Sequence, residues 1–123
     1  MADPQGWLPP WPQWWDADEL AALVPDPAVR QHFASGCPRL PLAMFEELHP
    51  PVPGWPDAPG GYLQLSDAYE DEAARARDLG WPVRQLETHH LALLTDPGKV
   101  ARELRKLIGQ PQMARVDTPE PSE

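Results

Sequence analysis

Two patterns of apolar residues divide the chain near Gly60. Before that point, apolar residues come in short groups separated by prolines, and after it they follow strand-like and then helix-like spacing. Proline interrupts both helix interiors and central strands. We therefore expect short helices and loops in residues 1–60 and regular elements in residues 61–109.

Three short helices are predicted in the first segment. Asp16 begins the first, with Glu19 as its capping-box partner, and Asp26 begins the second. Gly36 is suited to a left-handed cap at the end of the second helix. The three helices are expected at residues 16–25, 26–36 and 41–48.

Residues 1–15 form a tryptophan- and proline-rich arm, with tryptophan at positions 7, 11, 14 and 15. An extended arm of this kind exposes apolar surface, which in a soluble protein marks a contact with another segment or chain. The alternative is that the tryptophans fold back on the chain's own core. Both interpretations remain open from the sequence.

Residues 61–109 predict a strand–helix–strand unit followed by a last helix. The expected elements are a strand at 62–66, a helix at 67–79, a strand at 82–87 and a helix from Asp96 to Gly109. The intervening helix is long enough for the two strands to run in parallel. Both carboxyl ends should then lie at one edge, where α/β proteins bind ligands. The predicted class is α/β.

Residues 110–123 have no apolar periodicity and predict a disordered tail.

The formal net charge of −9 and the acidic isoelectric point argue against a nucleic-acid partner. Cys37 is the only cysteine, so no internal disulfide can form. No signal peptide or run of about eighteen apolar residues is present, and we expect a cytoplasmic protein without a membrane partner.

Two adjacent histidines, His89 and His90, follow the second predicted strand and precede the helix at Asp96. A histidine at that place can act as a general base, because its charge changes near neutral pH. The alternative is a histidine that only makes hydrogen bonds within a loop. Of the two histidines, His89 is expected to orient the loop rather than to react.

Residues 61–109 resemble the carboxyl-terminal end of α/β-hydrolase fold proteins of the esterase-like kind. The resemblance rests on a strand, an acidic turn, a helix, a second strand, a histidine before a short apolar run, and Asp-Pro at the start of a last helix. The segment LPLAMFEELHPPVPGWPDAP is similar to the lead-in to their penultimate strand. The tryptophan-rich helices resemble lid or cap material. The resemblance implies a partial α/β-hydrolase fold: a short parallel βαβ unit and a carboxyl-terminal helix, preceded by a cap-like segment.

In that family a histidine after the last strand is the base of a Ser-His-acid triad, and its place matches His90. The resemblance also implies that Asp67, just beyond the first predicted strand, is the acid that holds the imidazole tautomer. The alternative is that Ser66 or Asp67 only caps the following helix. The acidic residues at positions 70–72 are expected to form a solvated helix face.

The chain departs from the family pattern because it has no Gly-x-Ser-x-Gly nucleophile motif. Its serines, Ser35, Ser66 and Ser122, lack the required strand-to-helix setting. Cys37 is expected to be a small buried thiol rather than a nucleophile. No metal site, phosphate-binding loop or cofactor is predicted.

The resemblance implies the carboxyl-terminal part of an ester or acyl-bond hydrolase, inactive alone because it lacks a nucleophile. Its small acyl substrate would bind only when a nucleophile-bearing half completes the protein. The alternative is a non-enzymatic binding module on a remnant scaffold, which associates with itself or a partner through the arm and the strand edges. A remnant without a function of its own is a third interpretation.

Overall fold

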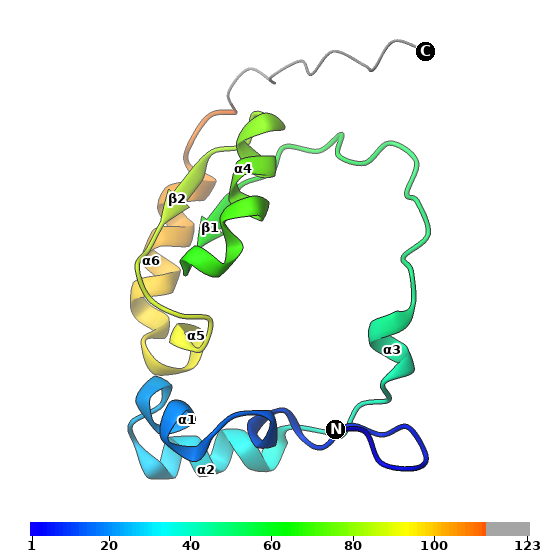
Figure 1. The fold of residues 1–123 in the computed structure, drawn as a ribbon. Coiled ribbons are helices and arrows are strands. Elements are labelled where there is room, and N and C mark those ends of the chain that lie inside the picture. The colour runs from blue at the N-terminus through cyan, green and yellow to red at the C-terminus, as the bar shows by residue number, and fades with distance from the viewer. Residues whose placement is uncertain (113–123) are drawn as a thin grey trace. The chain divides into compact units, whose positions relative to one another are not determined.

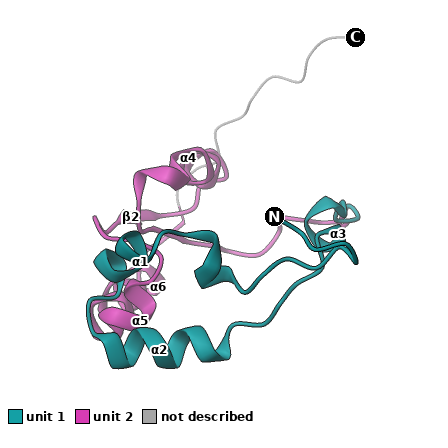
Figure 2. Cartoon of the chain, turned by 60° about the horizontal axis from the view of Figure 1, so that its bottom comes forward, with its two compact units in different colours: residues 1–51 teal, residues 52–123 magenta. Residues whose placement is uncertain are grey.

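The computed structural model describes residues 1–112, which form two compact units. The first unit is Met1–Pro51 and the second begins at Val52 (Figure 2). The expected disordered tail, residues 110–123, lies outside the described residues from position 113 onward.

The first unit is helical. Its elements are a 3-10 turn η1 at Trp11–Trp14 and the helices α1 at Ala17–Leu23, α2 at Pro27–Gly36 and α3 at Ala43–Glu46. The predicted starts of the first two helices are confirmed. Asp16 and Glu19 form the capping box of α1, and the Asp26 side chain accepts hydrogen bonds from the first-turn amides of α2.

Two details of this unit differ from the sequence prediction. The third helix covers fewer residues than 41–48, because Pro41 forms an isolated antiparallel bridge with Trp7 and the chain becomes extended at Glu47. Gly36 is the last residue of α2 and is not left-handed, since the positive-φ glycines among the described residues are Gly6, Gly54 and Gly80. Instead of a left-handed cap, a backbone hydrogen bond ends α2, in which the Cys37 amide donates to the Ala34 carbonyl.

The amino-terminal arm folds back on its own unit. Its backbone pairs with residues 40–42, where the Leu8 amide donates to the Leu40 carbonyl at 2.8 Å. The ring of Trp11 packs edge-on against Phe33 of α2, with centroids 6.0 Å apart. Arg39 forms an ion pair with Asp3. The Trp7 amide and then Arg39 lower the pKa of Asp3 by hydrogen bonding to its carboxylate.

The second unit has a mixed α/β fold with a two-stranded parallel sheet. Strand β1, Tyr62–Gln64, pairs in register with β2, Val83–Gln85. Between them lie a 3-10 turn η2 at Asp67–Tyr69 and helix α4 at Glu70–Asp78. Two helices follow β2, α5 at Ala92–Thr95 and α6 at Pro97–Ile108.

Helices α4 and α6 both contact β1 and β2 (Figure 1). Gln64 of β1 bonds to Glu70 of α4, whereas Arg84 of β2 bonds to Glu103 of α6. Gln64 pairs with Gln85, so Arg84 is one position away from the partner of Gln64. Because successive side chains of a strand point to opposite faces, Gln64 and Arg84 lie on opposite faces of the sheet. Helix α4 therefore covers one face and α6 the other. The buried core of this unit comprises Leu65, Ala73, Ala76, Ala92, Val100 and Leu107.

Both strands are shorter than the runs predicted for them, and the predicted helix at 67–79 begins as a 3-10 turn. Gly80 follows α4 and has a left-handed backbone conformation, with a φ of 78°. This conformation lets the chain reverse toward β2. The turn α5 has no strong sequence signal, because its four residues are too few for a helical period. Among residues 1–112, no helix has the length and apolarity to cross a membrane.

The loop before β1 makes its contacts within the second unit. Trp55 packs edge-on against Trp81 with centroids 5.8 Å apart. The Gln112 side chain donates to the Gly60 carbonyl at 2.7 Å and accepts from the Gly60 amide. A Cβ at Gly60 would meet the Trp81 ring. These contacts fix the direction from which the chain enters β1.

Candidate functional site

The carboxyl ends of β1 and β2 lie at one edge of the sheet, as the parallel arrangement requires. Hydrogen bonds hold the two segments together beyond the strands: the Leu86 amide donates to Gln64 at 2.9 Å and the Thr88 amide donates to Leu65 at 3.1 Å. An open hollow of about 420 Å³ lies at this edge. Its lining residues are Ser66, Asp67, Gln85, Leu86, Glu87 and Thr88.

Asp67 contributes an exposed carboxylate to this hollow. Ser66 occupies the N-cap position of η2 and Tyr69 that of α4, and neither helix start has a side-chain cap hydrogen bond. Within the described residues, the Asp67 carboxylate therefore satisfies no helix amide. It remains available to a partner at the edge of the sheet.

His90 lies in the turn after β2 and is exposed. Its ring packs against the ring of Tyr69, with centroids 4.1 Å apart and planes inclined by 42°. Tyr69 belongs to the same 3-10 turn as Asp67. The turn after β1 and the turn after β2 are thus in direct contact through this ring pair.

No hydrogen bond or ion pair joins Asp67 to His90 among residues 1–112, and His90 is not a lining residue of the hollow. The fold brings the two candidate residues to one edge of the sheet and holds their turns together. Catalytic hydrogen bonds are often long in the unliganded state and tighten when substrate binds. The arrangement is compatible with a base and an acid that complete their contact in a complex.

His89 differs from His90 in its surroundings. Its Nδ1 atom is buried without a hydrogen-bond partner in the described part of the chain. Its carbonyl accepts the amide of Ala92 at 3.0 Å and so begins α5. The backbone of His89 shapes the turn, and its ring is less accessible than that of His90.

A network of side chains braces the turn that carries Asp67 and Tyr69. Gln64, with an exposed fraction of 1%, donates to the Ser66 carbonyl at 3.1 Å and to the Glu70 carboxylate at 2.9 Å. Arg77 donates to the other Glu70 oxygen at 3.1 Å. The hydrogen bond from Gln64 and then that from Arg77 lower the pKa of Glu70.

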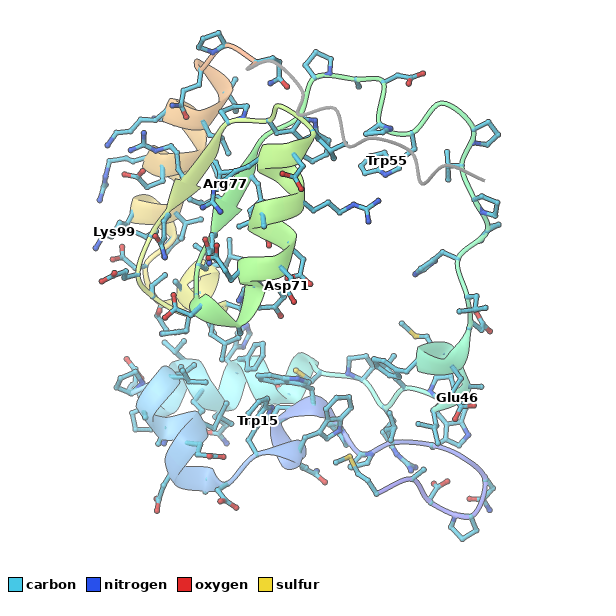
Figure 3. The ribbon with its side chains drawn as sticks, turned by 45° about the horizontal axis from the view of Figure 1, so that its top comes forward. Trp15, Glu46, Trp55, Asp71, Arg77 and Lys99 are labelled. Carbon is cyan, nitrogen blue, oxygen red and sulfur yellow. The ribbon has the colours of Figure 1, made fainter. Side chains whose placement is uncertain are left out.

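Glu70 is therefore a paired residue rather than part of a uniformly solvated acidic face. Asp71 and Arg77 both project from α4 (Figure 3). On β1, burial raises the pKa of the Tyr62 side chain, and the negative charge of Glu72 raises it further. The turn next to the candidate site is thus held by one buried amide and one paired carboxylate.

Gln64, Tyr69 and Glu87 are the site residues that the sequence analysis missed. A tyrosine two positions after Asp67 could have been noted as a neighbour of any group at that turn. The buried role of Gln64 has no sequence signal, because an isolated glutamine in an alternating strand predicts a solvent-facing position. Glu87, at the end of the second predicted strand, lines the hollow together with Ser66 and Asp67.

The serine and cysteine of the first unit make local contacts. The Ser35 hydroxyl donates to the His32 carbonyl at 2.7 Å, and the Cys37 thiol donates to the Phe33 carbonyl at 3.4 Å. Both bonds are of the kind that side chains make at helix ends. Within residues 1–112, no three His, Cys, Asp or Glu side chains converge as metal ligands would.

Comparisons of the chain with protein-family models, with curated proteins and with solved structures found no match.

Proposed function

We propose that this chain is the carboxyl-terminal segment of an esterase-like α/β-hydrolase, in which His90 is the general base and Asp67 its acid partner. The nucleophilic serine would be supplied by a polypeptide segment outside these 123 residues. The observation that supports the proposal is the contact between the turns after the two parallel strands, made by Tyr69 and His90.

In this mechanism the imidazole of His90 removes the proton of the serine hydroxyl as the oxygen attacks the acyl carbon. The imidazolium then gives that proton to the leaving alcohol, and a water molecule hydrolyses the acyl-serine in the same manner. The Asp67 carboxylate stabilises the imidazolium and fixes its tautomer. Its exposure at the edge of the sheet, without a helix-capping bond, leaves it able to do so.

The test is reconstitution of hydrolysis. The chain is co-expressed with the amino-terminal part of an esterase-like α/β-hydrolase that carries Gly-x-Ser-x-Gly and ends before its penultimate strand. Release of p-nitrophenol from p-nitrophenyl acetate is then measured. Activity should appear only with both parts, and His90→Ala should lower it by about 10⁶-fold, the usual cost of removing a triad histidine.

His89→Ala is the matched control, because it removes the adjacent imidazole and leaves His90 in place. It should retain most of the activity. Activity that survives His90→Ala, or that falls equally in both variants, contradicts the assignment of His90. Failure of the unmodified chain to support hydrolysis contradicts the proposed function as a whole.

A second candidate function is a binding module, and a different observation favours it. After the arm has folded back, the first unit still exposes large apolar side chains, including Trp15 at 45% and Phe45 at 54%. Apolar side chains gathered on a surface mark interaction sites. This candidate predicts that the chain associates with itself or a partner in light scattering, that Trp15→Ser weakens this association, and that no reconstituted hydrolysis appears.

A further inference from the structure

Gln64, the last residue of β1, holds two parts of the candidate site at once. Its backbone carbonyl accepts the Leu86 amide at 2.9 Å, at the start of the segment that leads to His90. Its side-chain amide donates to the Ser66 carbonyl at 3.1 Å and to the Glu70 carboxylate at 2.9 Å. One residue therefore connects the turn after β1 with the chain that leaves β2.

The two side-chain hydrogen bonds lie on either side of the site residues of this turn. Ser66 directly precedes Asp67, and Glu70 directly follows Tyr69. The Ser66 carbonyl also accepts the Tyr69 amide at 3.3 Å, which closes the 3-10 turn. Gln64 thus holds both ends of the short turn that carries the Asp67 carboxylate and the Tyr69 ring.

The position of Gln64 calls for a neutral side chain with two donors. Its Nε2 atom faces a carbonyl and a carboxylate, so a reversed amide would place Oε1 against two oxygen atoms. The side chain is 1% exposed, where a lysine or arginine would carry its charge out of water. Oε1 is buried and has no hydrogen-bond partner among residues 1–112. A buried acceptor without a partner is unfavourable, so the two donors explain the amide at this position.

Arg77 strengthens the hold on the far end of the turn. It donates to the second Glu70 oxygen at 3.1 Å, while Gln64 donates to the first. The hydrogen bond from Gln64, and after it that from Arg77, lowers the pKa of Glu70. Glu70 is therefore a charged acceptor at neutral pH, and hydrogen bonds to a charged acceptor are stronger than those between neutral groups.

We propose that Gln64 is a positioning residue for the candidate acid and base. In the described part of the chain it makes no hydrogen bond with Asp67 or His90. It fixes the turn of Asp67 and Tyr69 relative to the strand end that leads to His90. The Tyr69 ring, with its centroid 4.1 Å from that of His90, carries this placement to the imidazole. The inference rests on the proposed function, since a placement affects a rate only if these residues react.

The first part of the experiment is NMR on the full chain with Gln64→Met, which keeps the length of the side chain and removes both donors. The pKa of Glu70 should rise toward its ordinary value of 4.5, because its main hydrogen bond is lost. The ring-current displacement of the His90 signals by Tyr69 should shrink as the turn loosens. Gln110→Met is the matched control and should change neither, because the Gln110 side chain is exposed and makes no described hydrogen bond.

The second part is the rate of the reconstituted hydrolase. Gln64→Met should lower kcat by about 10- to 100-fold and leave KM nearly unchanged, because it displaces reacting groups and removes no substrate contact. Glu70→Ala removes one of the two acceptors and should give a smaller loss of kcat and a smaller change at His90. It should add little in the Gln64→Met background. Glu70 is exposed, so this variant tests the inference if Gln64→Met fails to fold.

An unchanged His90 displacement overturns the inference even if the Glu70 pKa rises, because Gln64 would then hold Glu70 alone. A rise in KM without a loss of kcat also overturns it, because that result indicates a substrate contact. The spectra require no nucleophile. Absence of reconstituted hydrolysis therefore contradicts the proposed function, whereas unchanged spectra contradict the role of Gln64.

Discussion

The ring of Tyr69 packs against the ring of His90 with centroids 4.1 Å apart, and this contact joins the turns that follow the two strands. No hydrogen bond orients the His90 side chain among the described residues, so the tyrosine ring is its principal neighbour. An aromatic pair of this kind is worth about 0.5–1.5 kcal/mol. We conclude that Tyr69 limits the orientations of His90.

Tyr69→Leu is expected to release the His90 ring. In proton NMR spectra of the chain, the ring-current displacement of the His90 ring signals should disappear, while those of His32 and His49 stay unchanged. Tyr69→Phe keeps the ring and should preserve the displacement. In reconstituted hydrolysis the leucine variant should lose roughly tenfold at most. Unaltered His90 signals in Tyr69→Leu would contradict the contact.

Asp67→Asn tests whether Asp67 is the acid partner of His90 or only a cap of the following helix. The Asp67 side chain makes no capping hydrogen bond, so the substitution should leave the free energy of unfolding within about 0.5 kcal/mol of the original. Asp26→Ala is the comparison, because Asp26 accepts amide hydrogen bonds at 2.9 Å and 3.3 Å. It should cost about 0.5–2 kcal/mol. Urea unfolding measures both. A comparable loss for Asp67→Asn would favour the capping interpretation.

Gly60→Ala is predicted to destabilise the second unit by about 1–3 kcal/mol, because the added methyl group overlaps the Trp81 ring. Gly98→Ala is the matched control within the same unit. Its methyl group meets only the flexible Arg102 side chain at 3.5 Å, at a helical position. It should stabilise by about 0.4–1 kcal/mol. Equal effects in urea unfolding would show that Gly60 is not closely packed.

The pH dependence of stability should include a contribution from Glu103. The hydrogen bond from Arg84, and then that from Lys106, lower the pKa of Glu103 below its ordinary value of 4.5. A carboxyl whose pKa is lowered by folding contributes stability above its unfolded pKa, and that stability is lost as pH falls through the folded pKa. Stability should therefore fall with acid below about pH 4.5, with Glu70 adding to the same trend.

Glu103→Gln should give a shallower loss of stability in acid, measured as the thermal midpoint against pH. Arg84→Gln removes the main partner of Glu103 and should produce a similar shallower curve. If both variants keep the original acid dependence, the ion pair between β2 and α6 does not contribute to it.

Much of the local structure follows from the sequence. Asp16, Asp26 and Gly80 act at the helix boundaries where their backbone chemistry places them. The parallel strand pair follows from the helical segment between two apolar runs. The shortness of the strands does not, because strand length depends on tertiary context.

The site was only partly accessible from sequence. The positions of Asp67 and His90 after parallel strands predict a shared edge. The ring contact that joins their turns depends on the path of the chain after each strand, which no local pattern specifies. The buried role of Gln64 likewise arises from one side chain bridging Ser66 and Glu70.

The central claim is that His90 and Asp67 act as one unit, and a double-mutant cycle in the reconstituted hydrolase tests it most directly. The rates of the unmodified chain, His90→Ala, Asp67→Asn and the double variant are compared. Residues that act together are strongly non-additive. We predict that Asp67→Asn lowers the rate by up to about 10⁴-fold alone and has little effect in the His90→Ala background. Independent, multiplicative losses would contradict the account.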